Sequence, residues 1–187
     1  MIKNIEKIIA EEFSKTTKED FFKRNQIEPD TISYAGSGDY GKAYYVNGDR
    51  ILKITSSEKE FEYAKEIKET NAPILDVIVE IYDVAIVDGD YYILMEEVDV
   101  DEEINDMYWQ VMDILNTQGL DILYINSIDE DELEEELDDN LSDFMDQLND
   151  IVRAYNYLGV YPPDIRPENL GYDKQGKLKA FDIDERG

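Results

Sequence analysis

The spacing of hydrophobic and polar positions changes along this 187-residue chain, and the change divides it near Asp99. The first part has helical spacing over Ile2–Phe13 and Thr17–Asn25, and then takes up the period of two that is typical of strands. Beyond Asp99 the spacing of three and four residues returns. We therefore predict an α+β protein with a β-rich N-terminal lobe, residues 1–98, and a mostly helical C-terminal lobe, residues 99–187.

Two tight turns predict hairpins in the first part. The pair Asn47-Gly48 separates the alternating runs KAYYV and RILKI, and the turn DGD separates EIYDVAIV from YYILMEEV. Between the two hairpins, SSEKEFEYAKEIKET has helical spacing, with Ser56 or Ser57 as a plausible N-cap. The pattern predicts an antiparallel sheet accompanied by one helix.

The second part contains three predicted segments before its last hairpin. These are a helix over Asp101–Thr117, the mixed segment GLDILYINS, and an acidic helix from Asp129 to Tyr157. The acidic helix is amphipathic, because its apolar residues recur at spacings of three and four: Leu133, Leu137, Leu141, Phe144, Met145 and Leu148. A solvated outer face explains its acidity more simply than a docking surface does.

The charge of the chain restricts its partners. The formal net charge is −28 and the pI is near 4.1, so nucleic acids and anionic membranes are repelled and basic protein surfaces are attracted. An acidic mimic of DNA would share this charge. The opening MIKNIEKIIAEEF is not a signal peptide, and no apolar run reaches the length of a membrane span. We expect a soluble, cytoplasmic protein that binds neither nucleic acid nor membranes.

The absence of Cys and His limits the possible chemistry. Disulfides, thiolate nucleophiles, His general bases and Cys or His metal ligands are all excluded. Catalysis would have to use carboxylates, amides, hydroxyls, Lys and Arg.

A glycine-rich stretch is the first chemical signal. GSGDYG places Gly36, Ser37, Gly38 and Gly41 between two predicted antiparallel strands, where a dinucleotide-binding fold would need a strand and then a helix. This context suits a flap whose backbone N–H groups approach phosphate oxygens. An ordinary flexible hairpin tip is an equally good explanation of the stretch by itself.

Lys53 is the second signal. Strand alternation in RILKI turns Lys53 away from the face of Leu52 and Ile54, where it could neutralise phosphate charge. A buried Lys needs an anionic partner, and the following helix offers Glu58, Glu60 and Glu62. Helical spacing favours Glu60, at the inner edge of the helix. A surface Lys is the common alternative.

With DIRPENLGYDKQGKLKAFDID near the C-terminus, these residues resemble the protein-kinase-like superfamily, including its small-molecule phosphotransferases, over about Thr31 to Asp184. The resemblance implies a two-lobed fold that binds ATP and Mg²⁺. In the catalytic segment, the resemblance implies that Asp164 is the catalytic base, that Arg166 replaces the usual Lys, and that Asn169 and Asp182 are the metal ligands. In the first lobe it implies that Gly36, Ser37, Gly38 and Gly41 form the glycine-rich loop, and that Lys53 is the phosphate-pairing lysine with Glu60 as its partner. Met95 would lie at the back of the adenine pocket, and Glu96 to Val98 would form the adenine-binding hinge.

The chain departs from the family pattern in three places, and these departures limit which kind of kinase-like protein it resembles. Pro162-Pro163 replaces the usual His-Arg before the base, and the metal-binding element is Asp182-Ile183-Asp184. Only five residues follow Asp182, so we expect a minimal or truncated kinase-like domain with no activation segment, and an exposed apolar floor where a second copy could pack.

The hypothesis is therefore an ATP- and Mg²⁺-dependent phosphotransferase acting on a hydroxyl of a protein or small molecule. Carboxylates, an amide and Arg suffice for this chemistry, because phosphoryl transfer requires mainly positioning and charge neutralisation. One alternative is an inactive pseudokinase that recruits a basic partner through its acidic face. A second alternative is an acidic mimic of DNA, which explains fewer of the motifs.

Overall fold

The structure is a computed structural model, and it describes residues 16–70, 72–128, 139–160 and 165–182. The predicted helix Ile2–Phe13, the first ten residues of the predicted acidic helix, and Asp164 lie outside these residues. The described chain is mixed α+β and divides into two compact units. The first unit comprises residues 1–71 and 80–97, and the second comprises residues 72–79 and 98–187.

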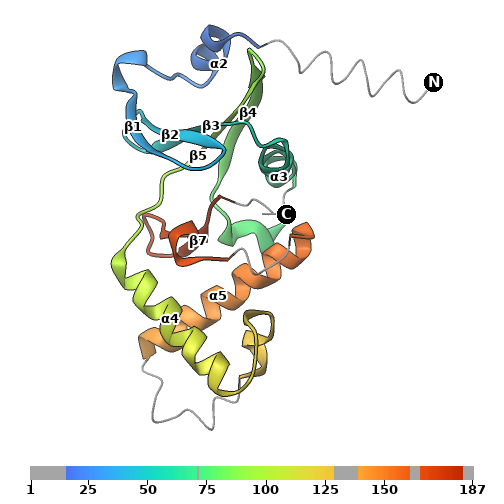
Figure 1. Ribbon diagram of the computed structural model, residues 1–187. Coiled ribbons are helices and arrows are strands. Elements are labelled where there is room, and N and C mark those ends of the chain that lie inside the picture. Colours follow the sequence, from blue (N-terminus) through green and yellow to red (C-terminus); the bar gives the residue numbers. More distant parts are fainter. Residues whose placement is uncertain (1–15, 71, 129–138, 161–164, 183–187) are drawn as a thin grey trace, which may run out of the picture. The chain divides into compact units, whose positions relative to one another are not determined.

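The first unit is built on a five-stranded antiparallel sheet in the order β1-β2-β3-β5-β4 (Figure 1). Both predicted hairpins are confirmed, and their turns have the positive φ that they need: 57° and 79° at Asn47 and Gly48, and 52° and 96° at Asp88 and Gly89. The strands are β1 (Ser33–Ser37), β2 (Gly41–Val46), β3 (Arg50–Thr55), β4 (Ile81–Val87) and β5 (Asp90–Glu96).

Two helices pack against this sheet. The helix α2 (Lys18–Arg24) is capped by Thr17, and its Phe21 and Phe22 join Leu52, Leu94 and other residues in a core on one face of the sheet. The helix α3 (Glu58–Glu69) contacts β3, β4 and β5. A short 3-10 helix, η1 (Pro29–Thr31), precedes β1.

Of the two serines that the sequence offered as N-cap of α3, the structure selects Ser57. Its side-chain oxygen accepts a hydrogen bond from the backbone N–H of Glu60 at 3.2 Å, which satisfies one of the free donors of the first helical turn. The cap therefore fixes the start of the helix at the turn that carries Glu60.

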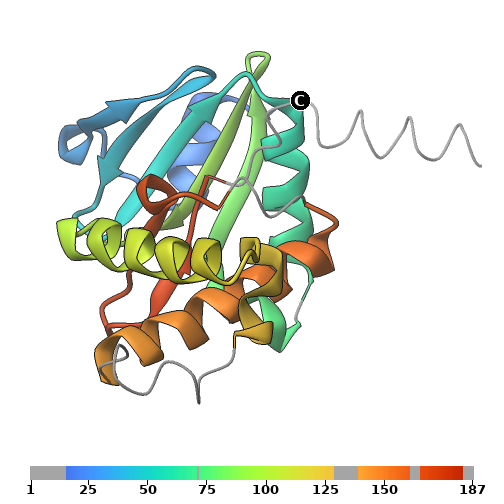
Figure 2. The ribbon, with the colours of Figure 1, turned by 60° about the horizontal axis from the view of Figure 1, so that its bottom comes forward.

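The second unit combines two long helices with a short hairpin. The helix α4 (Glu102–Thr117) begins at its N-cap Asp101, as its periodicity predicts, and α5 (Asp139–Leu158) contains the described part of the acidic helix. In Figure 2 the two helices lie beside each other, and they are in contact. The remaining elements are η2 (Pro73–Val77), η3 (Ile122–Ser127), η6 (Pro167–Asn169), β6 (Leu170–Tyr172) and β7 (Leu178–Ala180).

The apolar stripe of α5 forms much of the core of this unit. Leu148 and Ile151 are fully buried, and α5 contacts η2, η3 and β7. The hairpin is held to the helix by Gln147, whose side-chain oxygen accepts a hydrogen bond from the backbone N–H of Leu178 at 2.7 Å. No helix in the described parts of the chain is both long and apolar enough to cross a membrane.

Candidate functional site

The expected site residues fall into two sets, one in each unit.

The glycine-rich stretch begins in β1 with Gly36 and Ser37 and ends at Gly41, the first residue of β2. The backbone N–H of Gly38 donates to the carbonyl oxygen of Gly41 at 3.1 Å, which closes the hairpin. The stretch is therefore a hairpin tip between antiparallel strands, as its context predicts.

The glycines of this hairpin differ in what they do. A Cβ at Gly41 would lie 2.4 Å from the carbonyl oxygen of Ile54, so close packing against β3 requires glycine there. At Gly36 and Gly38 a Cβ would meet nothing within 4 Å. Packing among the residues that the structure describes does not explain these two glycines.

Lys53 and Glu60 form an ion pair, with the Lys53 Nζ 2.5 Å from the Glu60 Oε1. Their side chains are only 14% and 7% exposed. Of the three glutamates that the sequence offered as partners, the structure pairs Glu60 with the lysine, while Glu58 and Glu62 are exposed. The contact joins β3 to α3, on the sheet face opposite the one that α2 covers.

The nearest cross-strand neighbours of Lys53 on its face of the sheet are apolar. Ala43 of β2 and Ile93 of β5 lie directly across from Lys53, and Ile51 and Met95 form the next cross-strand pair on the same face. Ile93 and Met95 are buried, whereas Ala43 and Ile51 are half-buried. On this face the Lys53 ammonium thus lies beside apolar side chains of β2 and β5.

The expected hinge residues are divided between the units. The backbone N–H of Glu96 donates to the carbonyl oxygen of Glu80 at 2.9 Å, and a Glu96 carboxylate oxygen accepts from the N–H of Glu80 at 3.2 Å. Val98 belongs to the second unit, where its side chain covers Gly171: a Cβ on that glycine would lie 2.6 Å from Val98 Cγ2.

In the second unit, the hairpin β6–β7 brings the two expected metal ligands to one end. Leu170 pairs with Ala180, and just beyond them the N–H of Phe181 donates to the carbonyl oxygen of Asn169 at 2.9 Å. Asp182 follows directly. Its φ of 56° lies in the left-handed region, which costs a residue other than glycine roughly 1 kcal/mol and is found preferentially at functional positions.

Segments from elsewhere in the unit flank this hairpin on both edges. Tyr172 and Asp99 exchange two backbone hydrogen bonds of 2.8 Å on one edge, and the N–H of Val79 donates to the carbonyl oxygen of Ala180 at 3.0 Å on the other. Lys179 adds a side-chain contact, since its Nζ lies 2.6 Å from the carbonyl oxygen of Asp76. The end of the hairpin that carries Asn169 and Asp182 is therefore supported by distant parts of the chain.

The loop before the hairpin is anchored by α4. The buried hydroxyl of Tyr108 donates to the carbonyl oxygen of Ile165 at 2.8 Å, one residue before Arg166. Burial, followed by the negative charge of Glu168, raises the pKa of Tyr108, so the hydroxyl keeps its proton and remains a donor. Arg166 is 38% exposed, with Nη1 4.0 Å from Glu168 Oε1. Asp164, the expected base, lies outside the described residues.

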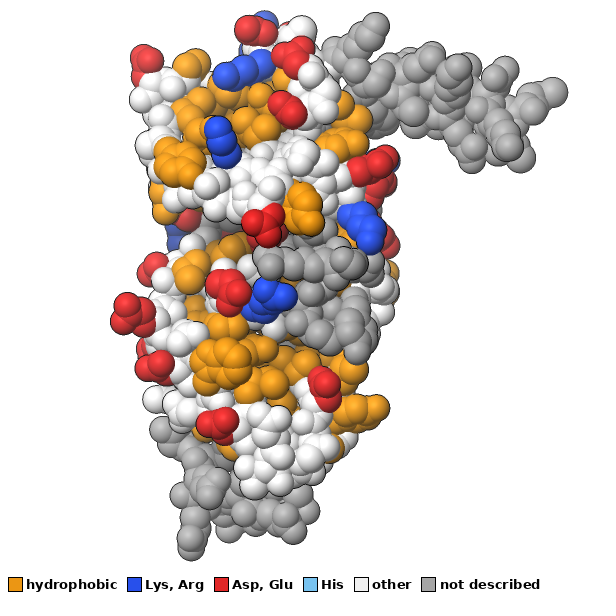
Figure 3. Space-filling model, in the orientation of Figure 1, with side chains coloured by type: hydrophobic (Ala, Val, Ile, Leu, Met, Phe, Trp, Pro, Cys, Tyr) orange, Lys and Arg blue, Asp and Glu red, His pale blue; other side chains and the backbone are white. Residues whose placement is uncertain are grey.

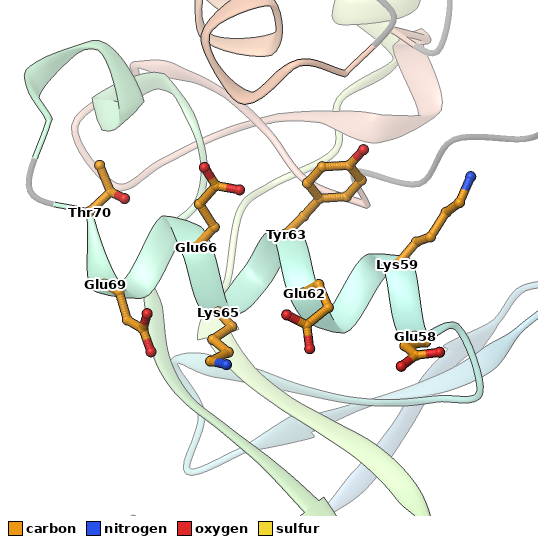
Figure 4. Close-up of a pocket in the computed structure, with 8 residues that line it drawn as sticks. All are labelled: Glu58, Lys59, Glu62, Tyr63, Lys65, Glu66, Glu69 and Thr70. Atoms are coloured by element: carbon orange, nitrogen blue, oxygen red, sulfur yellow. The ribbon is translucent and has the colours of Figure 1, made fainter. Parts of the chain in front are cut away.

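A separate shallow pocket of about 550 Å³ lies along α3 (Figure 4). Tyr63 and Glu66 point to one side of the helix, and Glu62 and Lys65 point to the other. Four glutamates and two lysines contribute to its lining, so it repels a polyanion such as ATP. Of its residues, the sequence had offered only Glu58 and Glu62, as possible partners of Lys53, and the structure pairs the lysine with Glu60. It is lined by Glu58, Lys59, Glu62, Tyr63, Lys65, Glu66, Glu69 and Thr70.

Sequence reasoning missed a buried carboxylate in β4. Asp83 accepts hydrogen bonds from Arg24 Nε at 2.6 Å, from Asn25 Nδ2 at 2.7 Å and from Lys68 Nζ at 2.7 Å, so it ties α2, the sheet and α3 together. Burial raises the pKa of Asp83, but the hydrogen bonds from Lys68, Asn25 and Arg24 outweigh it and hold the pKa below its usual range. The sequence did contain a signal for this burial, because Asp83 falls on the same face of the alternating strand IYDVAIV as its buried apolar residues.

Within the residues that the structure describes, no group of three or more acidic side chains is arranged to hold a metal ion. Asn169 and Asp182 lie at the same end of the β6–β7 hairpin, and amide and carboxylate oxygens are donors of the type that Mg²⁺ accepts. No model of a known protein family and no curated protein sequence matches this chain.

Proposed function

We propose that this chain is a kinase-like phosphotransferase with a two-lobed protein-kinase-like fold. It binds ATP with Mg²⁺ and transfers the terminal phosphate to a hydroxyl of a protein or small molecule. The observation that carries the proposal is the Lys53–Glu60 ion pair, buried at 2.5 Å on a sheet face that continues into the glycine-rich hairpin. A buried ion pair contributes little to stability in general, so a functional role, contact of the lysine with a ligand, explains this pair better.

In this proposal the first unit holds the nucleotide. Glu60 orients the Lys53 ammonium, and the ammonium donates hydrogen bonds to phosphate oxygens. The backbone N–H groups around Gly36, Ser37 and Gly38 approach the same phosphates. Ala43 and Met95 belong to the apolar surface that accepts the adenine ring, and the backbone from Glu96 to Val98 binds the edge of the ring.

The second unit supplies the polar groups for transfer. Asn169 and Asp182 would hold Mg²⁺ through their side-chain oxygens, and the bound ion would neutralise phosphate charge. Asp164 accepts the proton of the acceptor hydroxyl as its oxygen bonds to the terminal phosphorus and the bond to the ADP oxygen breaks. Arg166 stabilises the charge on the phosphate in transit, although its planar guanidinium differs in geometry from the usual Lys.

Calorimetric titration of the full chain with ATP and Mg²⁺ tests nucleotide binding. Lys53→Ala removes the cation that would neutralise phosphate charge and that pairs with Glu60, so it should weaken ATP binding by at least about tenfold, or about 1.4 kcal/mol. Lys59→Ala removes the same charge from an exposed position on α3 and should leave the affinity unchanged. Equal affinities for wild type and Lys53→Ala would remove Lys53 from the site and with it the basis of the proposal.

Transfer is tested separately with radiolabelled ATP. Asp164→Asn keeps the size of the side chain but not its basicity, so it should retain ATP affinity and lose transfer and hydrolysis. Suppose that wild type binds ATP yet labels no acceptor in cell extract and hydrolyses nothing above the Asp164→Asn background. The chain is then a nucleotide-binding pseudokinase.

A further inference from the structure

The only tryptophan of the chain lies on the surface of α4. Trp109 is 55% exposed, while Tyr108, its neighbour in sequence, is buried. The indole is held in place: Nε1 donates to the Asn105 side-chain oxygen at 3.2 Å, and the ring meets Tyr108 edge to face at 5.4 Å. A large aromatic ring is thus fixed on the outer face of a helix whose other face forms part of the core.

Acidic side chains surround this ring. Helical spacing puts Glu102, Asp106 and Asp113 on the same side of α4 as Trp109, at seven and three residues before it and four after it, and all three are exposed. Residues 99–128 contain seven acidic residues and neither Lys nor Arg. Figure 3 shows hydrophobic side chains exposed on the second unit with acidic groups at intervals around them.

We propose that the outer face of α4, centred on Trp109, is a docking surface for a basic segment of a protein partner. A guanidinium or ammonium group placed over the indole gains a cation–π interaction, which is strongest with tryptophan. Glu102, Asp106 and Asp113 pair with neighbouring cations of the segment. An aromatic anchor inside a charged rim is the usual composition of an interaction hot spot.

Charge complementarity selects this occupant over the alternatives. A nucleic acid is repelled by a chain of net charge −28. A second copy would bring the same negative field to the surface, because the second unit alone carries 26 acidic and 6 basic residues. The surface does not depend on nucleotide chemistry, and its residues are not among those proposed to bind ATP.

The test uses the full chain and a short synthetic peptide of alternating arginine and serine. Because Trp109 is the sole tryptophan, its fluorescence reports directly on this surface: the peptide should change its emission, and a matched peptide with glutamate in place of arginine should not. Fluorescence anisotropy of a labelled arginine peptide then compares variants. Trp109→Ala should weaken binding by about tenfold and Asp106→Asn/Asp113→Asn by about threefold or more.

Matched controls separate this surface from general attraction to an acidic protein. Asp88→Asn/Asp90→Asn removes two exposed charges at the β4–β5 turn of the first unit and should change peptide affinity by less than about twofold. Lys53→Ala should bind the peptide as wild type does, so loss of ATP binding and loss of peptide binding are distinguishable.

Two results would overturn the proposal. One is equal peptide affinity for wild type and Trp109→Ala, which means that the acidic surface attracts cations without a defined site. The other is a concentration-dependent dimer in light scattering that Trp109→Ala abolishes, which makes a second copy the occupant of the surface.

Discussion

The two units of this protein differ in their net charge and in how their carboxylates are used. The first unit contains 12 basic and 20 acidic residues, for a net charge of −8, and it buries Glu60 and Asp83 against cationic partners. The second unit has a net charge of −20, and acidic residues such as Glu102, Asp106 and Asp143 lie exposed on its helices. Glu60 and Asp83 of the first unit therefore join its helices to its sheet, whereas the larger negative charge of the second unit creates the stronger field for a partner.

The hairpins of the two units differ in the length of their strands and in what flanks them. In the first unit the turns at Asn47-Gly48 and Asp88-Gly89 have positive φ and join strands of six or seven residues, while in the second unit Gly176, with a φ of 78°, lies in the turn between β6 and β7. The hairpin β6–β7 has only three residues in each strand and is flanked by Asp99 and Val79, which lie far away in sequence. Turn residues therefore favour hairpins in both units, and long-range contacts add support to the short hairpin of the second.

The largest expected effect contrasts a buried carboxylate with an exposed one. Asp83→Ala removes three hydrogen bonds that join α2, β4 and α3, two of them to cations, and should lower the free energy of unfolding by about 3 kcal/mol. Asp143→Ala on the exposed side of α5 should change it by less than about 0.5 kcal/mol. Urea denaturation measures both. Similar values for the two variants would contradict the contrast between the units.

A second comparison uses glycines in the two sheets. At Gly171 of β6 a Cβ would lie 2.6 Å from Val98 Cγ2 and 3.0 Å from the Asp99 carbonyl oxygen, so Gly171→Ala should cost about 2 kcal/mol. At Gly36 of β1 the space is open, and Gly36→Ala should cost less than about 0.5 kcal/mol. Hydrogen exchange should show faster exchange in β6 and β7 for Gly171→Ala; an unchanged rate would mean that the edge contacts do not support the hairpin.

The third prediction concerns the hydroxyl that anchors the loop before β6. Tyr108→Phe leaves the buried carbonyl oxygen of Ile165 without this donor and should lower the free energy of unfolding by about 1 kcal/mol. Tyr124→Phe, at a side chain that is 55% exposed, is the matched control and should be neutral. Thermal denaturation compares the two, and equal melting temperatures would show that the anchor contributes nothing.

The smallest effect is a pH dependence of the first unit. The pKa of Asp83 is held below its ordinary value of 3.8, so its stabilising contribution is fully present above about pH 5 and is lost as the pH falls through the folded-state pKa. Asp83→Asn lacks this contribution. The difference in unfolding free energy between wild type and Asp83→Asn should therefore be constant near neutral pH and shrink below pH 3.8. The subtraction cancels the surface carboxylates, and a constant difference down to pH 3 would refute the assignment.

The elements that the sequence predicted correctly are those whose cause is local. Asn47-Gly48 and Asp88-Gly89 adopt positive φ because these residues tolerate it, and Ser57 caps α3 because its hydroxyl reaches the first turn. The Lys53–Glu60 pair could also be predicted from the sequence, since strand alternation orients the lysine and helical spacing selects the glutamate. The nucleotide and metal roles of these residues remain predictions.

The tertiary structure decided what depends on residues far apart in the chain. Residues 72–79 lie between two elements of the first unit, yet they pack in the second, with Ile78 and Val79 along β7. The carboxylate of Asp83 can be buried in β4 because Arg24 and Lys68, about 59 and 15 residues away in sequence, neutralise its charge. Periodicity reports which face of an element is buried, but the partner that covers a face or neutralises a charge is chosen by long-range packing, which no local pattern encodes.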